Sequence, residues 1–363
     1  MMTFSSGVFG TDTADDEYTE LRQLVDDIGR RSFDARIGQR RIPEQFDAEL
    51  WRNLEDTGLA RLTSTADLGA GPPELAITLS GIARHAGAVP LAETDALAGW
   101  LGNLAGIELP AGPLTVAIAD ADASGRRVCG TASDVPWTRA CAAVLLLARS
   151  PDEARVGVVD IHDAQLADSH NLAGEPRDRL TFNVAADELA VVDPAATDEL
   201  SLRGSWCRCV QVVGALDAAA AMSVTHTRER IQFGRPLSKF QSVQHALAAM
   251  AGEIERARAA ATLAVAAAAE YGFSCRETEF AVAVARVAVG RAVTPVTTIA
   301  HQLHGAIGVT AEHPLSAVTL RAQSWSNDYG TTAGYARRLG RMALDAADPW
   351  DLVIGNFRPV QST

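Results

Sequence analysis

A break between two long helical patterns constrains the fold of this chain most. Residues 228–241 read RERIQFGRPLSKFQ, and Gly234 and Pro236 form the break because both residues favour turns. Arg230, Gln232 and Phe233 place a guanidinium, an amide and an aromatic ring within four residues. Such a set can clamp a pyrophosphate, donate hydrogen bonds and stack on a planar ring. The break therefore predicts either an ordinary corner between helices or a grip on a large planar anionic cofactor.

A second segment follows a later helical pattern. Residues 301–310 read HQLHGAIGVT, and residues 312–315 read EHPL. Gly305 and Gly308 allow the backbone to approach a cofactor closely, although glycines after a helix are more often simple C-caps. The flanking His301 and His304 are expected to be satisfied turn histidines. No metal site is expected, because the remaining histidines are scattered without ligand spacing.

Taken together, the two segments resemble the acyl-CoA dehydrogenase family of flavoproteins. In that family an Arg-x-Gln-Phe-Gly turn and a Gln-x-x-Gly-Gly/Ala-x-Gly turn bind the FAD of a neighbouring subunit. The resemblance is specific in the C-terminal half, weaker in the N-terminal half and thin in the middle. It implies a cofactor-binding set in this chain: Arg230, Gln232, Phe233, Gly234, Gln241, Gln302, Gly305 and Gly308.

The same resemblance implies partners. These are an acyl-CoA substrate, dehydrogenase-like subunits in a hetero- or homotetramer, and electron-transfer flavoprotein or a similar electron acceptor. The formal charge of −13 argues against nucleic acid, which needs a basic surface. The apolar run at 259–269 is too short to cross a bilayer, and no secretion signal is expected. Five scattered cysteines are expected to be reduced and structural, so a cytoplasmic protein is expected.

The pattern along the chain predicts an α+β fold that is mainly α. Residues 1–112 form an N-terminal helical domain, with helices expected at 15–33, 43–58 and 75–85. Residues 113–198 form a small β-domain, with short apolar runs at 115–118, 143–147, 156–159, 180–184 and 189–192. Residues 199–363 form a four-helix bundle whose last helix is expected at 315–344. This order matches the architecture that the family resemblance implies.

The chain departs from the family pattern where the reaction takes place. Residues 118–125 lack the Pro and Gly-Ser of the usual flavin-binding stretch, and Trp137 and Thr138 are at best substitutes for a second one. The reaction needs a carboxylate to remove the α-proton of the thioester. At the family's Tyr-Glu-Gly-Thr stretch, Tyr329 takes the place of the base, and Asp328 is displaced by one residue. Asp328 is therefore either a displaced base or a solvated helix acid.

Three functions follow from these observations. The first is an FAD-dependent acyl-CoA dehydrogenase subunit that completes the FAD site of a sister subunit, acting on bulky thioesters such as steroid side-chain CoA esters. The second is a self-sufficient homomeric dehydrogenase that uses Asp328 or another acid as base. The third is a non-enzymatic scaffold that has the fold and no flavin.

Overall fold

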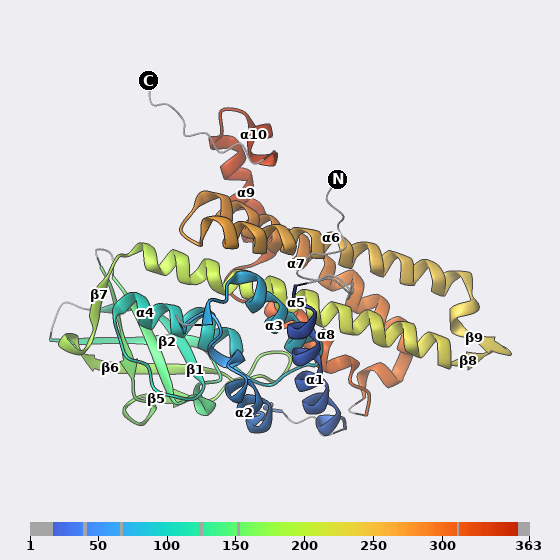
Figure 1. Cartoon of the computed structure of the whole chain (residues 1–363), viewed down its shortest axis with the longest axis horizontal. Coiled ribbons are helices and arrows are strands. Elements are labelled where there is room, and N and C mark those ends of the chain that lie inside the picture. Colours follow the sequence, from blue (N-terminus) through green and yellow to red (C-terminus); the bar gives the residue numbers. More distant parts are fainter. Residues whose placement is uncertain are drawn as a thin grey trace.

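A computed structural model describes residues 17–38, 42–65, 68–122, 126–150, 153–310 and 312–354. The fold is mainly helical, with a mixed sheet beside a set of long helices that run across the molecule (Figure 1). The predicted α+β class and the order of helices, strands and helices are confirmed.

The N-terminal helices are short and pack on the rest of the chain through buried leucines and alanines. α2 begins later than its apolar pattern predicts because the Asp47 carboxylate caps it, accepting a hydrogen bond from the Leu50 backbone at 2.9 Å. The first helix was expected from residue 15, which lies outside the described residues. The helical elements are α1 (Thr19–Arg36), α2 (Ala48–Asp56), α3 (Pro72–Arg84), the π-helix η3 (Glu93–Gly99) and α4 (Trp100–Ala105).

A seven-stranded sheet follows, in the order β5-β6-β2-β1-β3-β4-β7. β1 and β3 are parallel and all other pairs are antiparallel. Sequence reasoning missed β2 and β5, because β2 alternates buried and exposed small residues and β5 has three residues only. The strands are β1 (Leu114–Asp122), β2 (Arg127–Pro136), β3 (Ala143–Arg149), β4 (Ala154–Val159), β5 (Gln165–Ala167), β6 (Arg177–Ala185) and β7 (Ala190–Val192).

The C-terminal part contains three long helices and three shorter ones. The single helix expected at 315–344 is wrong: it is two helices, separated by a turn at 326–331. Tyr329 and Gly330 there have φ values of 57° and 118°, which a helix cannot accommodate. The elements are α5 (Ala195–Glu229), α6 (Gln241–Tyr271), α7 (Arg276–His304), α8 (Leu315–Trp325), α9 (Thr332–Asp345) and α10 (Pro349–Val353).

α5 is the central element of this arrangement. It crosses the molecule from the sheet to the hairpin of β8 (Ile231–Gln232) and β9 (Arg235–Pro236) (Figure 1). Most of its residues from Leu200 to Ala219 are buried. α5 and the segment Arg276–Val309 are long and apolar enough to span a membrane, but 72% and 56% of their apolar windows are buried within the protein. A helix that is apolar on all sides and covered by its neighbours is a core helix.

Candidate functional site

The first predicted segment forms a tight hairpin at the end of α5. Strands β8 (Ile231–Gln232) and β9 (Arg235–Pro236) pair through a two-residue turn at Phe233 and Gly234, whose φ values are 51° and 78°. Two positive φ angles are typical of the turn that matches strand twist in short hairpins. The segment is therefore a protruding hairpin, which is more elaborate than a plain corner between helices.

The hairpin presents its polar and aromatic groups to the outside. Phe233 is 90% exposed and Ile231 is 64% exposed. Arg230, Gln232 and Gln241 are exposed as well. The Phe233 ring packs edge-on against that of Phe240, with centroids 6.1 Å apart, yet most of its surface remains exposed. An exposed aromatic of this size is typical of a surface that a partner covers.

The second predicted segment lies at the end of α7. Gly305 has a φ of 65° and its backbone N–H bonds to the His301 carbonyl, so it is a helix C-cap. Gln302 is exposed, whereas Gly308 is buried. A Cβ atom at Gly308 would come within 2.9 Å of the His304 Cβ, so this close approach requires glycine.

The structure brings the two segments to the same end of the molecule. The imidazole of His226, in the last turn of α5, stacks on that of His304, the last residue of α7, with ring centroids 4.5 Å apart. Arg230 follows His226 by one helical turn, and its backbone N–H donates to the His226 carbonyl at 2.9 Å. Two motifs separated by about 70 residues therefore form one candidate surface.

Asp328, the candidate base, is held by two arginines. Its Oδ2 accepts a hydrogen bond from Arg208 Nε at 2.8 Å and another from Arg177 at 3.1 Å. Burial alone would raise the pKa of Asp328, but the charges and hydrogen bonds of Arg177 and Arg208 hold it below its usual value. Asp328 lies in the turn after α8 with a mostly buried side chain, so the expectation of a solvated helix acid is wrong.

The turn that carries Asp328 is fixed from behind. Arg286 of α7 is buried and its guanidinium donates to three carbonyls of this turn, those of Ser326, Asp328 and Gly330, at 3.0, 2.8 and 2.5 Å. A planar guanidinium with several fixed acceptors is a rigid brace. Asp328 therefore cannot move toward a substrate without breaking these contacts.

The ion pairs around Asp328 extend through the interior. Arg208 also pairs with Glu93 at 2.5 Å and donates to Gln211 at 2.6 Å. The Trp325 indole donates to Glu175 at 2.9 Å, and Glu175 pairs with both Arg177 and Arg321. The network joins η3, the sheet, α5 and α8, because its members come from all four.

Little space remains beside this network. The Tyr329 ring packs against Gly204 of α5, where a Cβ atom would come within 2.7 Å of it. The adjoining cavity, lined by Glu93, Arg177 and Arg208, has a volume of about 10 Å³. That volume has room for no more than about one water molecule, whereas sites for small molecules usually measure about 300–1,000 Å³.

A larger cavity lies elsewhere. It has a volume of about 300 Å³ and lies between η3, α5 and α6, with Asp95, Trp100 and Arg203 in its wall. Burial raises the pKa of Asp95, although its carboxylate accepts hydrogen bonds from Thr63 and Ser64. Sequence reasoning did not identify Asp95, because no motif surrounds it.

The residues considered for the flavin ring are buried in this chain. Trp137 is 3% exposed and packs with Ala88 and Cys141, and the Thr138 hydroxyl donates to the Val135 carbonyl at 3.2 Å. Both residues serve the turn between β2 and β3. Residues 123–125 of the other stretch lie outside the described residues.

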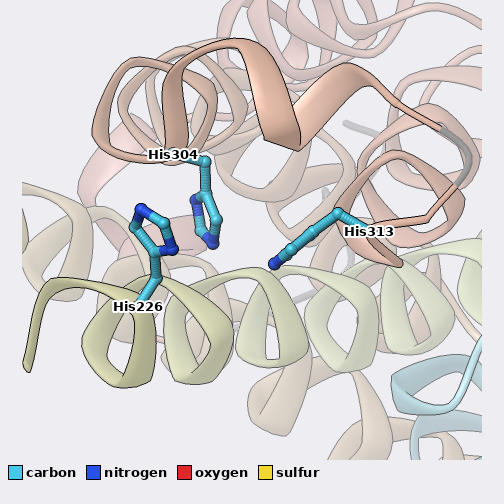
Figure 2. Close-up of side chains that lie close together, drawn as sticks. All are labelled: His226, His304 and His313. Carbon is cyan, nitrogen blue, oxygen red and sulfur yellow. The ribbon is translucent and has the colours of Figure 1, made fainter. Parts of the chain in front are cut away.

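The histidines are less scattered in space than in sequence. His226, His304 and His313 bring their ring nitrogens within 4.8 Å of one another (Figure 2). Three separate elements supply these histidines, so no local sequence motif marks the cluster. The expectation of no metal site, which rested on sequence spacing alone, stays a prediction.

Comparison with known proteins agrees with this architecture. Residues 202–343 match the acyl-CoA dehydrogenase C-terminal domain. Acyl-CoA dehydrogenase FadE27 of Mycobacterium tuberculosis is 27% identical over 352 residues, which cover 83% of this chain and 89% of that protein. Residues 202–343 thus form the C-terminal domain of the acyl-CoA dehydrogenases, a family of flavoprotein oxidoreductases of lipid metabolism, and the chain as a whole is similar to members of that family.

Two solved heteromeric assemblies are similar in fold and sequence. A chain of the ChsE4–ChsE5 complex from Mycobacterium tuberculosis superposes with a TM-score of 0.79 at 25% identity, covering 93% of this chain and all of that one. A chain of the steroid acyl-CoA dehydrogenase Tcur3481–Tcur3483 superposes with a TM-score of 0.77, also at 25% identity, covering 91% and 98%.

Proposed function

We propose that this chain is the partner subunit of a heteromeric FAD-dependent acyl-CoA dehydrogenase. It holds the nucleotide end of the FAD of a sister subunit, and the sister subunit performs the α,β-desaturation of an acyl-CoA thioester. The observation that carries the proposal is a contrast within one chain. The cofactor grip at residues 230–241 is exposed, whereas the carboxylate nearest the base position is locked between Arg177 and Arg208.

The locked carboxylate is a poor base for this reaction. Removal of an α-proton needs a carboxylate that reaches the substrate and gains a proton readily. Asp328 has a lowered pKa and two arginine partners. Protonating it would break both ion pairs, and the adjoining cavity leaves no room for an acyl chain. This region is consistent with a structural role that replaced catalysis.

The exposed residues fit the pyrophosphate and adenosine end of FAD. Arg230 can clamp phosphate oxygens with two parallel hydrogen bonds, Gln232 and Gln302 offer amide groups, and Phe233 offers a ring face. No atom lies within 4 Å of the position of a Cβ on Gly305, so backbone and ligand can meet there. The flavin itself would supply the hydride acceptor, and this chain would only orient it.

The substrate class is inferred from the two heteromeric neighbours. One of them is described as a steroid acyl-CoA dehydrogenase. We infer a bulky thioester, such as a steroid side-chain CoA ester, bound by the sister subunit. Electron-transfer flavoprotein or a similar protein would reoxidise the flavin. All five cysteines are free, which supports a reducing cytoplasmic compartment.

A self-sufficient dehydrogenase is the second candidate, and one observation favours it. Asp95 lines the larger cavity and has a raised pKa, as a general base should. Against it, the Asp95 carboxylate already accepts hydrogen bonds from the backbone of Thr63 and Ser64 and so holds that loop. Asp95→Asn separates the two roles. If Asp95 is the base, the variant loses turnover, and if it only anchors the loop, the variant loses stability.

The decisive experiment is to purify the chain alone and after co-expression with a sister chain that has glutamate at the position of Tyr329. Visible absorption gives the flavin per subunit, and turnover is measured with an acyl-CoA and an artificial electron acceptor. We expect flavin and activity only in the co-expressed complex. Full flavin and activity in the isolated chain would favour the self-sufficient enzyme. Colourless protein in both preparations would favour the third function, a non-enzymatic scaffold without flavin.

A further inference from the structure

Three histidines converge between the ends of α5, α7 and the loop before α8. Figure 2 shows the rings of His226, His304 and His313 directed into the same space from these three elements. His304 is the central one, with its ring centroid 4.5 Å from that of His226 and 4.7 Å from that of His313. We propose that these three side chains bind one zinc-class divalent metal ion.

The hydrogen bonds of His304 prepare it as a ligand. Its Nδ1 lies 2.7 Å from the Ala300 carbonyl, which can only accept, so Nδ1 carries the proton. The lone pair is then on Nε2, which is buried and has no hydrogen-bond partner among the described residues. A histidine whose Nδ1–H donates to a backbone carbonyl while Nε2 is free has the arrangement that metal-binding histidines show. Burying that lone pair without a partner is otherwise costly.

His313 must change one contact to bind the ion. Its Nδ1 accepts the backbone N–H of Leu315 at 3.1 Å, at the start of α8. Either Nδ1 exchanges this hydrogen bond for the metal, or the ring turns over and presents Nε2. The cost is a hydrogen bond of about 1 kcal/mol, which a metal–nitrogen bond more than offsets.

The spacing is close to that of a metal site. The three ligand atoms lie within 4.8 Å of one another. Two nitrogens bound to one tetrahedral zinc ion are about 3.4 Å apart, so the widest pair has to close by about 1.4 Å. His226 and His313 are half-buried side chains at the rim, and rotation of their rings can supply this movement.

Charged groups of both signs lie near the cluster. Glu229 and Glu312 are exposed nearby in sequence, whereas Arg230 follows His226 by one helical turn. A water molecule can fill the open position of the ion.

His301 is outside this set. Its Nε2 lies 2.9 Å from the Thr319 hydroxyl, so that nitrogen is engaged within the protein. The imidazole ligands favour Zn²⁺, Cu²⁺ or Ni²⁺ over the hard cations Mg²⁺ and Ca²⁺. The structure therefore assigns a three-histidine site one helical turn from Arg230, and the assignment does not depend on flavin binding.

The test uses the metal-free chain after chelation, without flavin. Zn²⁺ is titrated by calorimetry, and Co²⁺ is titrated by its visible absorption, which reports imidazole ligation directly. We expect one ion per chain. His226→Ala and His304→Ala should each weaken binding at least about tenfold, and His245→Ala, an exposed histidine on α6, should leave it unchanged.

His226→Ala protects the test against misfolding, because His226 is half-buried and at a helix end, whereas His304 is buried. Circular dichroism confirms that each variant is folded. No binding by the wild-type chain would overturn the proposal, as would binding that the His226 and His304 variants retain in full. Either result leaves the flavin proposal untouched, since flavin stoichiometry is measured separately on the complex.

Discussion

At the residue scale, one departure from the acyl-CoA dehydrogenase pattern concerns the expected catalytic base. Tyr329 occupies the position expected for the base, and its ring fills the space beside Gly204. The carboxylate of the neighbouring Asp328 belongs to a buried ion-pair network with Arg177 and Arg208. Sequence reasoning identified the displaced acid but not its partners, because Arg177 and Arg208 are 151 and 120 residues away along the chain.

We predict that Asp328→Asn destabilises the protein by about 1.5–3 kcal/mol at neutral pH, because it removes the carboxylate that Arg177 and Arg208 share and leaves each arginine with one acid partner, Glu175 and Glu93 respectively. The unfolded carboxyl has a pKa of 3.8 and the folded value is lower. Its stabilising contribution is therefore present above pH 3.8 and is lost as the pH falls through the folded pKa. Urea unfolding from neutral to acidic pH measures the free energy of unfolding of wild type and variant. The loss of stability at acidic pH that comes from Asp328 should be absent in the variant.

Asp187→Asn is the control, because Asp187 is exposed and its replacement should change stability by less than about 0.5 kcal/mol. In the co-expressed complex, folded Asp328→Asn protein should retain turnover. Loss of turnover without loss of stability would restore Asp328 as the base.

At the scale of elements, helix spacing was predicted well and the turns were not. The long apolar stripes of α6 and α7 gave their positions to within a few residues, since one face of each is buried over many turns. The break between α8 and α9 escaped because Tyr329 gives no local sign of a positive φ. The histidine cluster escaped for a similar reason: its members come from three elements that only the tertiary fold brings together.

Close helix packing gives a prediction at this scale. A Cβ at Gly214 of α5 would come within 2.1 Å of the Ser80 carbonyl oxygen in α3, which is backbone and cannot move aside. We expect Gly214→Ala to destabilise the protein by about 1–3 kcal/mol. Gly252→Ala on α6 meets nothing within 4 Å and should stabilise by about 0.5–1 kcal/mol, since alanine favours helix.

Thermal or urea unfolding of both variants and of wild type measures the change in the free energy of unfolding. Each variant is the control for the other, because both add the same methyl group. Equal effects from Gly214→Ala and Gly252→Ala would show that α3 and α5 are not in close contact. That result would contradict the helix arrangement on which the ion-pair network depends.

At the scale of the whole molecule, the exposed hairpin fits the proposed assembly with a sister subunit. The sequence motif located it, but its exposure could not be read from the motif, since the same residues fit a buried corner. We predict that Arg230→Ala lowers flavin retention in the co-expressed complex about tenfold or more, because a charge-assisted contact to phosphate is lost. Flavin released per subunit after gel filtration measures this.

Arg291→Ala is the matched control, since Arg291 is exposed on α7 and its loss removes the same charge elsewhere. Circular dichroism of Arg230→Ala should equal that of wild type, because no buried contact is removed. Unchanged flavin occupancy in Arg230→Ala would count against the assignment of this residue to the pyrophosphate.

α5 connects the buried ion-pair network to the exposed hairpin. Arg208, inside the ion-pair network, lies on α5, and Arg230 directly follows the end of that helix, about 33 Å away at 1.5 Å per residue. In the proposed heteromer, a substitution near Arg208 would therefore leave the hairpin at the far end of α5 unchanged. A chain built on this helix could lose catalysis and still hold the FAD of a sister subunit.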